Sequence, residues 1–250
     1  MQVALPEQGP LLKTLHMTIN NNPAFLLRHL TNLKELRINS LNEKAFEVLA
    51  TNCKDLEVLE WIQNPPFIEE SFGRPPHDAL HQFLVSCSSL KVFNGIERFV
   101  KADDIIREPW ACQGIEKLRC RIVGIERLTQ AEQVIHDRVV AANPRYLHSD
   151  VSLVMSELTD KERAVVQKLQ RSREQQRQVY ERLTSLKHLK HLDLGYENRH
   201  RSLATYISEI GGEEYLRYRG PTPDTLELSL ESGLGLLDTL EDLEMFGFEA

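Results

Sequence analysis

The chain has 250 residues, of which 41% are hydrophobic and 27% charged, a composition typical of a folded globular protein. Its net charge of −7 at pH 7 gives no overall attraction for nucleic acid or for an anionic membrane, so we expect neither as a partner. No apolar run approaches the roughly 20 residues that span a bilayer, and residues 1–10 lack the basic-then-apolar order of a secretory signal, so we expect a cytoplasmic or nuclear protein.

The first predicted elements are two short strands built on one apolar pattern. Leu, two residues, Leu, one residue and a large apolar residue occupy 12–17 and again 33–38. Alternate side chains of a strand point to opposite faces, so Leu36 should point into a core and Arg37 outward. Residues 41–53 follow with apolar side chains at helical spacing, which predicts a helix packed behind the strand.

The same pattern recurs along the rest of the chain. It begins at Leu12, Leu33, Leu56, Leu90, Ile115, Leu189 and Leu240, with a shortened version at 226–230. The first four intervals are 21, 23, 34 and 25 residues, and the next, 74 residues, requires an insertion. A leucine-rich repeat has roughly 20–29 residues and contributes one strand and one helix or turn.

Stacked units of this kind bury one another's apolar faces, which a single unit cannot do. We therefore expect an α/β fold: a leucine-rich-repeat solenoid with a curved parallel sheet on its concave side, helices on its convex side and a long helical insertion. Residues 1–250 should form a single domain, as part of a longer array. The strand leucines that should then form one buried row are Leu15, Leu36, Leu59, Leu118, Leu192 and Leu243.

The four cysteines follow the same register. Three of them lie three residues before the first apolar position of a unit, in a column that reads Leu30, Cys53, Cys87, Cys112, Leu186 and Leu237. A column that mixes Cys with Leu indicates buried packing, because a free thiol behaves as a small hydrophobe. Cys120 falls at an inward strand position. A disulfide framework or a metal site is the alternative, but no Cys-x-x-Cys pair supports it.

The run L-x-x-L-x-I-N-x-L…L-A-x-x-C-x-x-L between Leu33 and Leu56 resembles the cysteine-containing leucine-rich repeat. That subtype is typical of F-box/leucine-rich-repeat proteins, the substrate-recognising subunits of SCF ubiquitin ligases. The phrases at 110–120, 183–195 and 226–246 look like the degenerate repeats of the fungal branch of this family. The resemblance implies a repeat fold and a role in recognising another protein.

One departure from the family concerns the F-box, the helical segment that binds the Skp adaptor. Residues 5–17 begin with Leu5-Pro6, as F-boxes often do, but run straight into the repeat pattern at Leu12. We find no room for an F-box, and therefore expect Skp as a partner only if an F-box lies outside this chain.

Three insertions interrupt the pattern, at about 62–80, 125–186 and 196–224. Two Pro-Pro pairs predict a loop over the first, either a tolerated surface insertion or a functional loop. His77 at its end and His81 just after it are four residues apart and could share a helix face, but no third metal ligand is nearby. The third insertion contains a Tyr/Arg alternation at 215–219, which indicates a variable loop or an exposed recognition strand.

The insertion at 125–186 contains a capping-box pattern, Thr159 to Glu162, that predicts a long helix over 157–186. Its middle, 168–178, is polar on all sides, so the helix should project into solvent and pack only at its ends. Three arginines there (171, 173 and 177) form either a docking surface for an acidic partner or a merely solvated face.

No catalytic signature is present: the chain has no Walker loop, no Gly-x-Ser-x-Gly and no His-Glu-x-x-His. The adjacent Asp103 and Asp104 should not face each other on a helix. We therefore expect a protein that is not an enzyme and that has no cofactor and no metal.

What remains is a surface, made by the outward strand positions of the concave sheet. The candidate protein-binding residues are His16, Arg37, Glu60, Asn94, Lys117, Arg119, Arg121, His191, Asp193 and Glu244. The alternative is that these side chains only keep the protein soluble. We expect a protein-binding module for substrate recognition in an SCF-type ubiquitin ligase pathway. The second hypothesis is a ubiquitin-independent regulatory scaffold of the ribonuclease-inhibitor or GTPase-activator kind.

Overall fold

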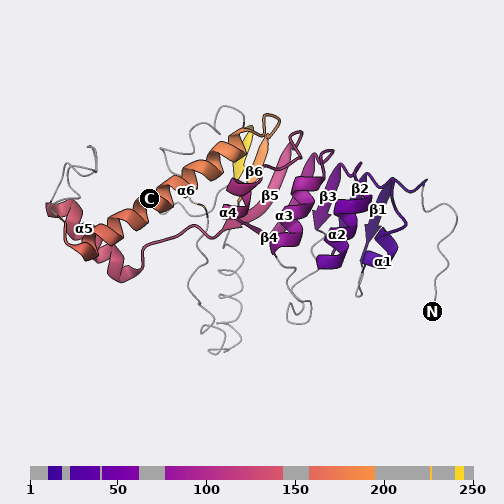
Figure 1. Ribbon diagram of the computed structural model, residues 1–250. Coiled ribbons are helices and arrows are strands. Elements are labelled where there is room, and N and C mark those ends of the chain that lie inside the picture. Colours follow the sequence, from indigo (N-terminus) through magenta and orange to yellow (C-terminus); the bar gives the residue numbers. More distant parts are fainter. Residues whose placement is uncertain are drawn as a thin grey trace, which may run out of the picture.

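The computed structural model describes residues 11–18, 23–39, 41–61, 77–142, 158–194, 226 and 240–244. These residues form an α/β fold around one open, seven-stranded parallel sheet (Figure 1). The strands are β1 (Thr14–Met17), β2 (Glu35–Ile38), β3 (Val58–Trp61), β4 (Val92–Lys101), β5 (Lys117–Val123), β6 (His191–Asp193) and β7 (Asp242–Glu244). The helices are α1 (Ala24–Leu27), α2 (Glu43–Asn52), α3 (His77–Ser86), α4 (Ala102–Arg107), α5 (Gln130–Ala142) and α6 (Asp160–Thr184).

The strands lie in the sheet in the order of the sequence, and each is parallel to the next. Their register aligns one apolar side chain per strand, in the row Leu15, Leu36, Leu59, Phe93, Leu118, Leu192 and Leu243. Leu36, Leu59 and Leu118 are fully buried. The predicted ladder of leucines is therefore confirmed in register, and Phe93 completes it.

Helices α1, α2 and α3 pack side by side against the apolar face of the sheet (Figure 1). Helix α2 begins after Asn42, which caps its first turn by accepting a hydrogen bond from the Ala45 amide at 3.0 Å. Its inward side chains include Phe46, whose ring lies 5.9 Å from that of Phe83 on α3. Burial of each such side chain contributes roughly 1.5–3 kcal/mol.

The cysteine column lies in this core, as predicted. Cys53, Cys87, Cys112 and Cys120 are all buried and free. The Cys53 thiol donates to the Leu30 carbonyl at 3.4 Å, and the Cys87 thiol donates to the Leu56 carbonyl at 3.5 Å. The thiols of Cys53 and Cys87 thus each form a hydrogen bond with a main-chain carbonyl of the preceding unit. Leu237 lies outside the described residues.

One predicted boundary is wrong. Residues 77–80 belong to α3 and not to the loop expected over 62–80, because Ala79 and Leu80 extend the buried face of that helix. β4 is longer than the apolar pattern, and its register against β5 shifts between Asn94 and Phe99. The rest of the first insertion and the whole of 196–224 lie outside the described residues.

The expected helical insertion lies between β5 and β6 and contains α5 and α6. Helix α6 extends away from the sheet, and α5 lies beside its far end (Figure 1). The capping box is confirmed, since the Thr159 amide donates to Glu162 Oε2 at 3.0 Å and the Glu162 amide donates to Thr159 Oγ1 at 3.4 Å. Helix α5 was not predicted, although Thr129 and Glu132 form a second capping pair ahead of it.

The expectation that α6 packs only at its ends is partly wrong. Its last turns bury Val179 and Leu183 in the main core, and Val166 packs near its start in a small second core with α5. Between them, Gln175 Nε2 donates to Asp103 Oδ1 at 2.6 Å and to the Gly124 carbonyl at 3.1 Å. Polar side chains therefore tie the middle of the helix to the body, which a search for apolar periodicity does not detect.

Candidate protein-binding face

The strand positions that alternate with the leucine row fall into two parallel rows in the register, and their residues are polar apart from Val58 and Val92. One row reads His16, Arg37, Glu60, Asn94, Arg119, Asp193 and Glu244. The other reads Thr14, Glu35, Val58, Val92, Lys117, His191 and Asp242. Arg121 lies further along β5, opposite Phe99. The predicted surface residues are thus brought together on one face by the strand register, although they are spread over most of the sequence.

The first half of this face is a chain of ion pairs. Glu35 lies 3.1 Å from His16 Nε2 and 2.7 Å from Arg37 Nε, and Arg37 Nε lies 3.1 Å from Glu60. Hydrogen bonding from His16, with the nearby Arg37, lowers the pKa of Glu35. Such exposed pairs contribute little to stability, but they orient the side chains that a partner would meet.

In the second half of this face, Asp193 is buried, although it was predicted to be an exposed binding residue. This carboxylate forms an ion pair with Arg119 across β5 and β6, but Asp193 is 8% exposed and does not present an accessible surface. An aspartate is short, so its carboxylate stays close to the sheet, whereas the longer Arg119 side chain remains 29% exposed. Arg119 is therefore the member of this pair that a partner can reach.

A third row, at the residue before each strand, was not predicted. It reads Lys13, Lys34, Glu57, Lys91, Glu116, Lys190 and Glu241, and it alternates in charge from Lys34 onward. Glu57 lies 2.7 Å from both Lys34 and Lys91, and hydrogen bonds from these two ammonium groups lower its pKa to about 2. The signal was present in the repeat pattern, because each of these residues directly follows the first apolar residue of its unit.

Lys117 differs from the lysines of that row. It is exposed on β5, and no described residue forms an ion pair with it. Its register neighbour on β4 is Val92, whose own neighbour on β3 is Val58, and both valines are half-buried. An aliphatic pair with a cation beside it thus interrupts an otherwise polar face.

The arginine patch expected on α6 is smaller than predicted. Arg177 pairs with Glu174 at 2.6 Å and also with Glu181, and its hydrogen bond lowers the pKa of Glu174 to about 2. Arg171 and Arg173 are exposed and have no ion pair with any described residue. Neutralisation of Arg177 weakens the case for an acidic partner at this helix.

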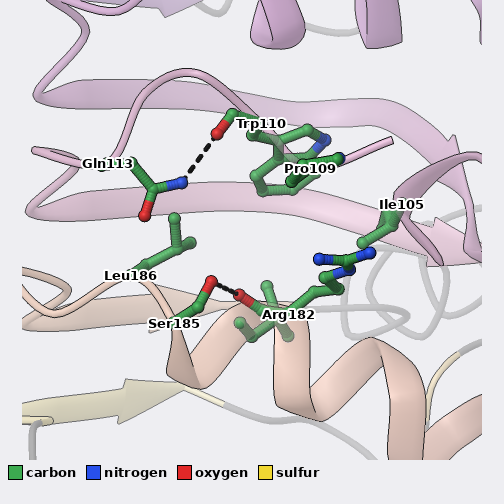
Figure 2. Close-up of a pocket in the computed structure, with 8 residues that line it drawn as sticks. Ile105, Pro109, Trp110, Gln113, Arg182, Ser185 and Leu186 are labelled. Carbon is green, nitrogen blue, oxygen red and sulfur yellow. Dashed lines mark hydrogen bonds between the residues drawn. The ribbon is translucent and has the colours of Figure 1, made fainter. Parts of the chain in front are cut away.

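A hollow lies between α4 and the end of α6, lined in part by Trp110, Gln113, Arg182 and Ser185 (Figure 2). Its polar side chains bond to main-chain carbonyls: Gln113 to that of Trp110 at 2.7 Å, Ser185 to that of Arg182 at 2.6 Å, and Arg182 to that of Ile106 at 3.0 Å. Of these bonds, the one from Arg182 to Ile106 joins α6 to the body, and the other two are local to their own segments.

The other residues considered for chemistry lie apart. His81 is buried in α3 with its Nε2 atom 3.9 Å from Glu108, and Asp104 is buried beside Arg107 whereas Asp103 faces α6. Within the described ranges, no three or more His, Cys, Asp or Glu side chains are placed to hold a metal ion. No helix in the part of the chain that the structure describes is long and apolar enough to cross a membrane.

Comparison of the chain with protein-family models, with curated proteins and with solved structures gives no match.

Proposed function

We propose that the chain is a leucine-rich-repeat solenoid that binds another protein through the polar face of its sheet. The observation that carries the proposal is the strand register, which aligns one apolar residue from each strand, together with the recurring sequence pattern. Solenoids built in this way use the face away from their helices as a binding surface.

The dimensions and chemistry of this face fit a protein better than a small molecule. Seven strands about 4.8 Å apart span roughly 30 Å. The polar rows run across that whole width, and their charges suit the steering and selection of a macromolecular partner. A small ligand would need a concave, largely apolar pocket with a few convergent polar groups, and neither row of side chains provides one.

The cysteine-containing repeat supports a more specific role, substrate recognition in an SCF-type ubiquitin ligase pathway. In that role the face selects the substrate, and an F-box elsewhere would supply the contact with the Skp adaptor. Four reduced, buried thiols fit the cytoplasm or the nucleus, where disulfides are rare.

Site-specific photo-cross-linking in cells tests the binding face. The photoreactive residue benzoylphenylalanine is placed at Arg37 on the sheet, and, as a matched control, at Lys44, an exposed lysine of α2 on the helical side. We expect a discrete protein adduct from position 37 and none from position 44. Adducts of equal yield from both positions, or none from position 37, would contradict the proposal.

The lifetime of the cross-linked partner then tests the ubiquitin role. If the chain recognises a substrate for degradation, its depletion should lengthen the half-life of the partner, and a proteasome inhibitor should remove the difference. An unchanged half-life would instead favour the regulatory scaffold, because a scaffold would bind the partner through the same face without causing its degradation.

A further inference from the structure

Val58 and Val92 occupy neighbouring positions on β3 and β4, near the middle of the polar face. They are register partners on β3 and β4, so their side chains project from the same side of the sheet about 4.8 Å apart. Both are half-buried, which leaves part of each side chain open to a partner. The centre of a protein interface is more apolar than its polar rim, so an aliphatic pair surrounded by polar groups suits such a centre.

Lys117 lies one strand further along the same row, next to Val92. Lys34 and Lys91 both form ion pairs with Glu57, whereas no described acidic residue pairs with Lys117. Its ammonium group has no acidic partner among the described residues and is therefore available to a carboxylate from outside.

The surrounding charges define the polarity of the face. On the β2–β3 side, two carboxylates, Glu35 and Glu60, share the single guanidinium of Arg37. On the β5 side, Arg119 is paired with Asp193, so the charge of Lys117 leaves this side with a net positive charge. An acidic group would thus be repelled from one side of the valine pair and attracted to the other.

We propose that Val58, Val92 and Lys117 bind an extended segment of a protein partner in which an aliphatic residue is followed or preceded, two positions away, by Asp or Glu. Residues two positions apart in an extended chain lie about 7 Å apart on the same side. This spacing lets the aliphatic side chain rest on the valine pair while the carboxylate reaches the Lys117 ammonium. The inference rests on the proposed function and specifies the chemistry of the partner.

Selection from a displayed library of random 12-residue peptides tests this inference with the purified full chain. We expect the wild-type protein to enrich peptides with Leu, Ile or Val two positions from Asp or Glu. Lys117→Glu should lose that enrichment roughly tenfold or more and favour Lys or Arg at the same position, because like charges at an interface repel. Lys44→Glu, the same charge change on α2, should select the wild-type set.

Two more conservative variants distinguish a change in binding preference from a loss of folding. Lys117→Gln removes the charge without reversing it and should abolish the acidic preference while the far-ultraviolet circular dichroism stays unchanged. Val92→Thr keeps the side-chain shape and the strand preference and should weaken the aliphatic preference alone. If these variants select the same peptides as the wild-type protein, or if the wild-type protein enriches no such motif, the inference is wrong.

The result is separable from the test of the proposed function. A discrete adduct from position 37 combined with no acidic motif in the selection would leave the protein-binding role standing and remove this partner chemistry. Failure of both experiments would remove both.

Discussion

Truncation of Leu36 in the leucine row gives the sharpest test of which strand positions are buried. Leu36 is fully buried on β2 between Leu15 and Leu59, and its neighbour Arg37 points to the opposite face with 44% of its side chain exposed. Leu36→Ala removes buried methyl groups and leaves a cavity, a change that costs about 3–4 kcal/mol in comparable cores. That is a large fraction of the roughly 5–15 kcal/mol by which folded domains are stable.

Arg37→Ala is the matched control, because it lies on the same strand one residue away. It loses surface ion pairs with Glu35 and Glu60, which typically contribute about 0–1 kcal/mol. Both variants are unfolded in urea and followed by circular dichroism, and the difference in free energy of unfolding is read from the shift of the midpoint. We expect Leu36→Ala to be the less stable variant by at least about 2 kcal/mol.

Equal destabilisation by the two substitutions would refute the assignment of inward and outward positions. A stronger form of the same test is Leu36→Asp, which buries a charge without a partner and should unfold the neighbouring units together. Hydrogen exchange of β1, β2 and β3 would report that loss, since each unit is stabilised mainly by contacts with its neighbours.

Three more predictions follow from individual contacts. Burial raises the pKa of the Cys53 thiol to about 11 and that of the Cys112 thiol to about 12, so iodoacetamide at pH 7.5 should label none of the four cysteines before urea unfolds the chain, and rapid labelling of the native protein would contradict this. The depressed pKa of Glu57 stabilises the fold above its unfolded value near 4.3, so the stability difference between wild type and Glu57→Gln should disappear as the pH falls from about 4 to about 2; a difference that stays constant over this range would exclude the pairing. Gln175→Ala should speed hydrogen exchange in the middle of α6 without changing exchange in β2 or β3, and identical exchange in α6 would show that its bonds to Asp103 and Gly124 do not hold the helix.

The sequence by itself determined which apolar side chains of β2 and β5 point into the core. Alternation in a strand and helical spacing are local properties, so Leu36 and Phe46 could be assigned to the core from their neighbours alone. The recurrence of the pattern also predicted that the leucines would align, because repeated units with the same internal spacing stack in the same register. The capping box at Thr159 was readable for the same reason, since it depends on residues only three positions apart.

Only the tertiary structure decided which charges meet. Glu57 pairs with Lys34 and Lys91, which lie 23 and 34 residues away in the sequence, because the sheet places them on adjacent strands. The same placement buries Asp193 beside Arg119, and it leaves Lys117 next to Val92 with no ion-pair partner among the described residues. These pairings depend on distances of a few ångströms between separate units, which local periodicity does not contain, and they determine what chemistry the face can offer a partner.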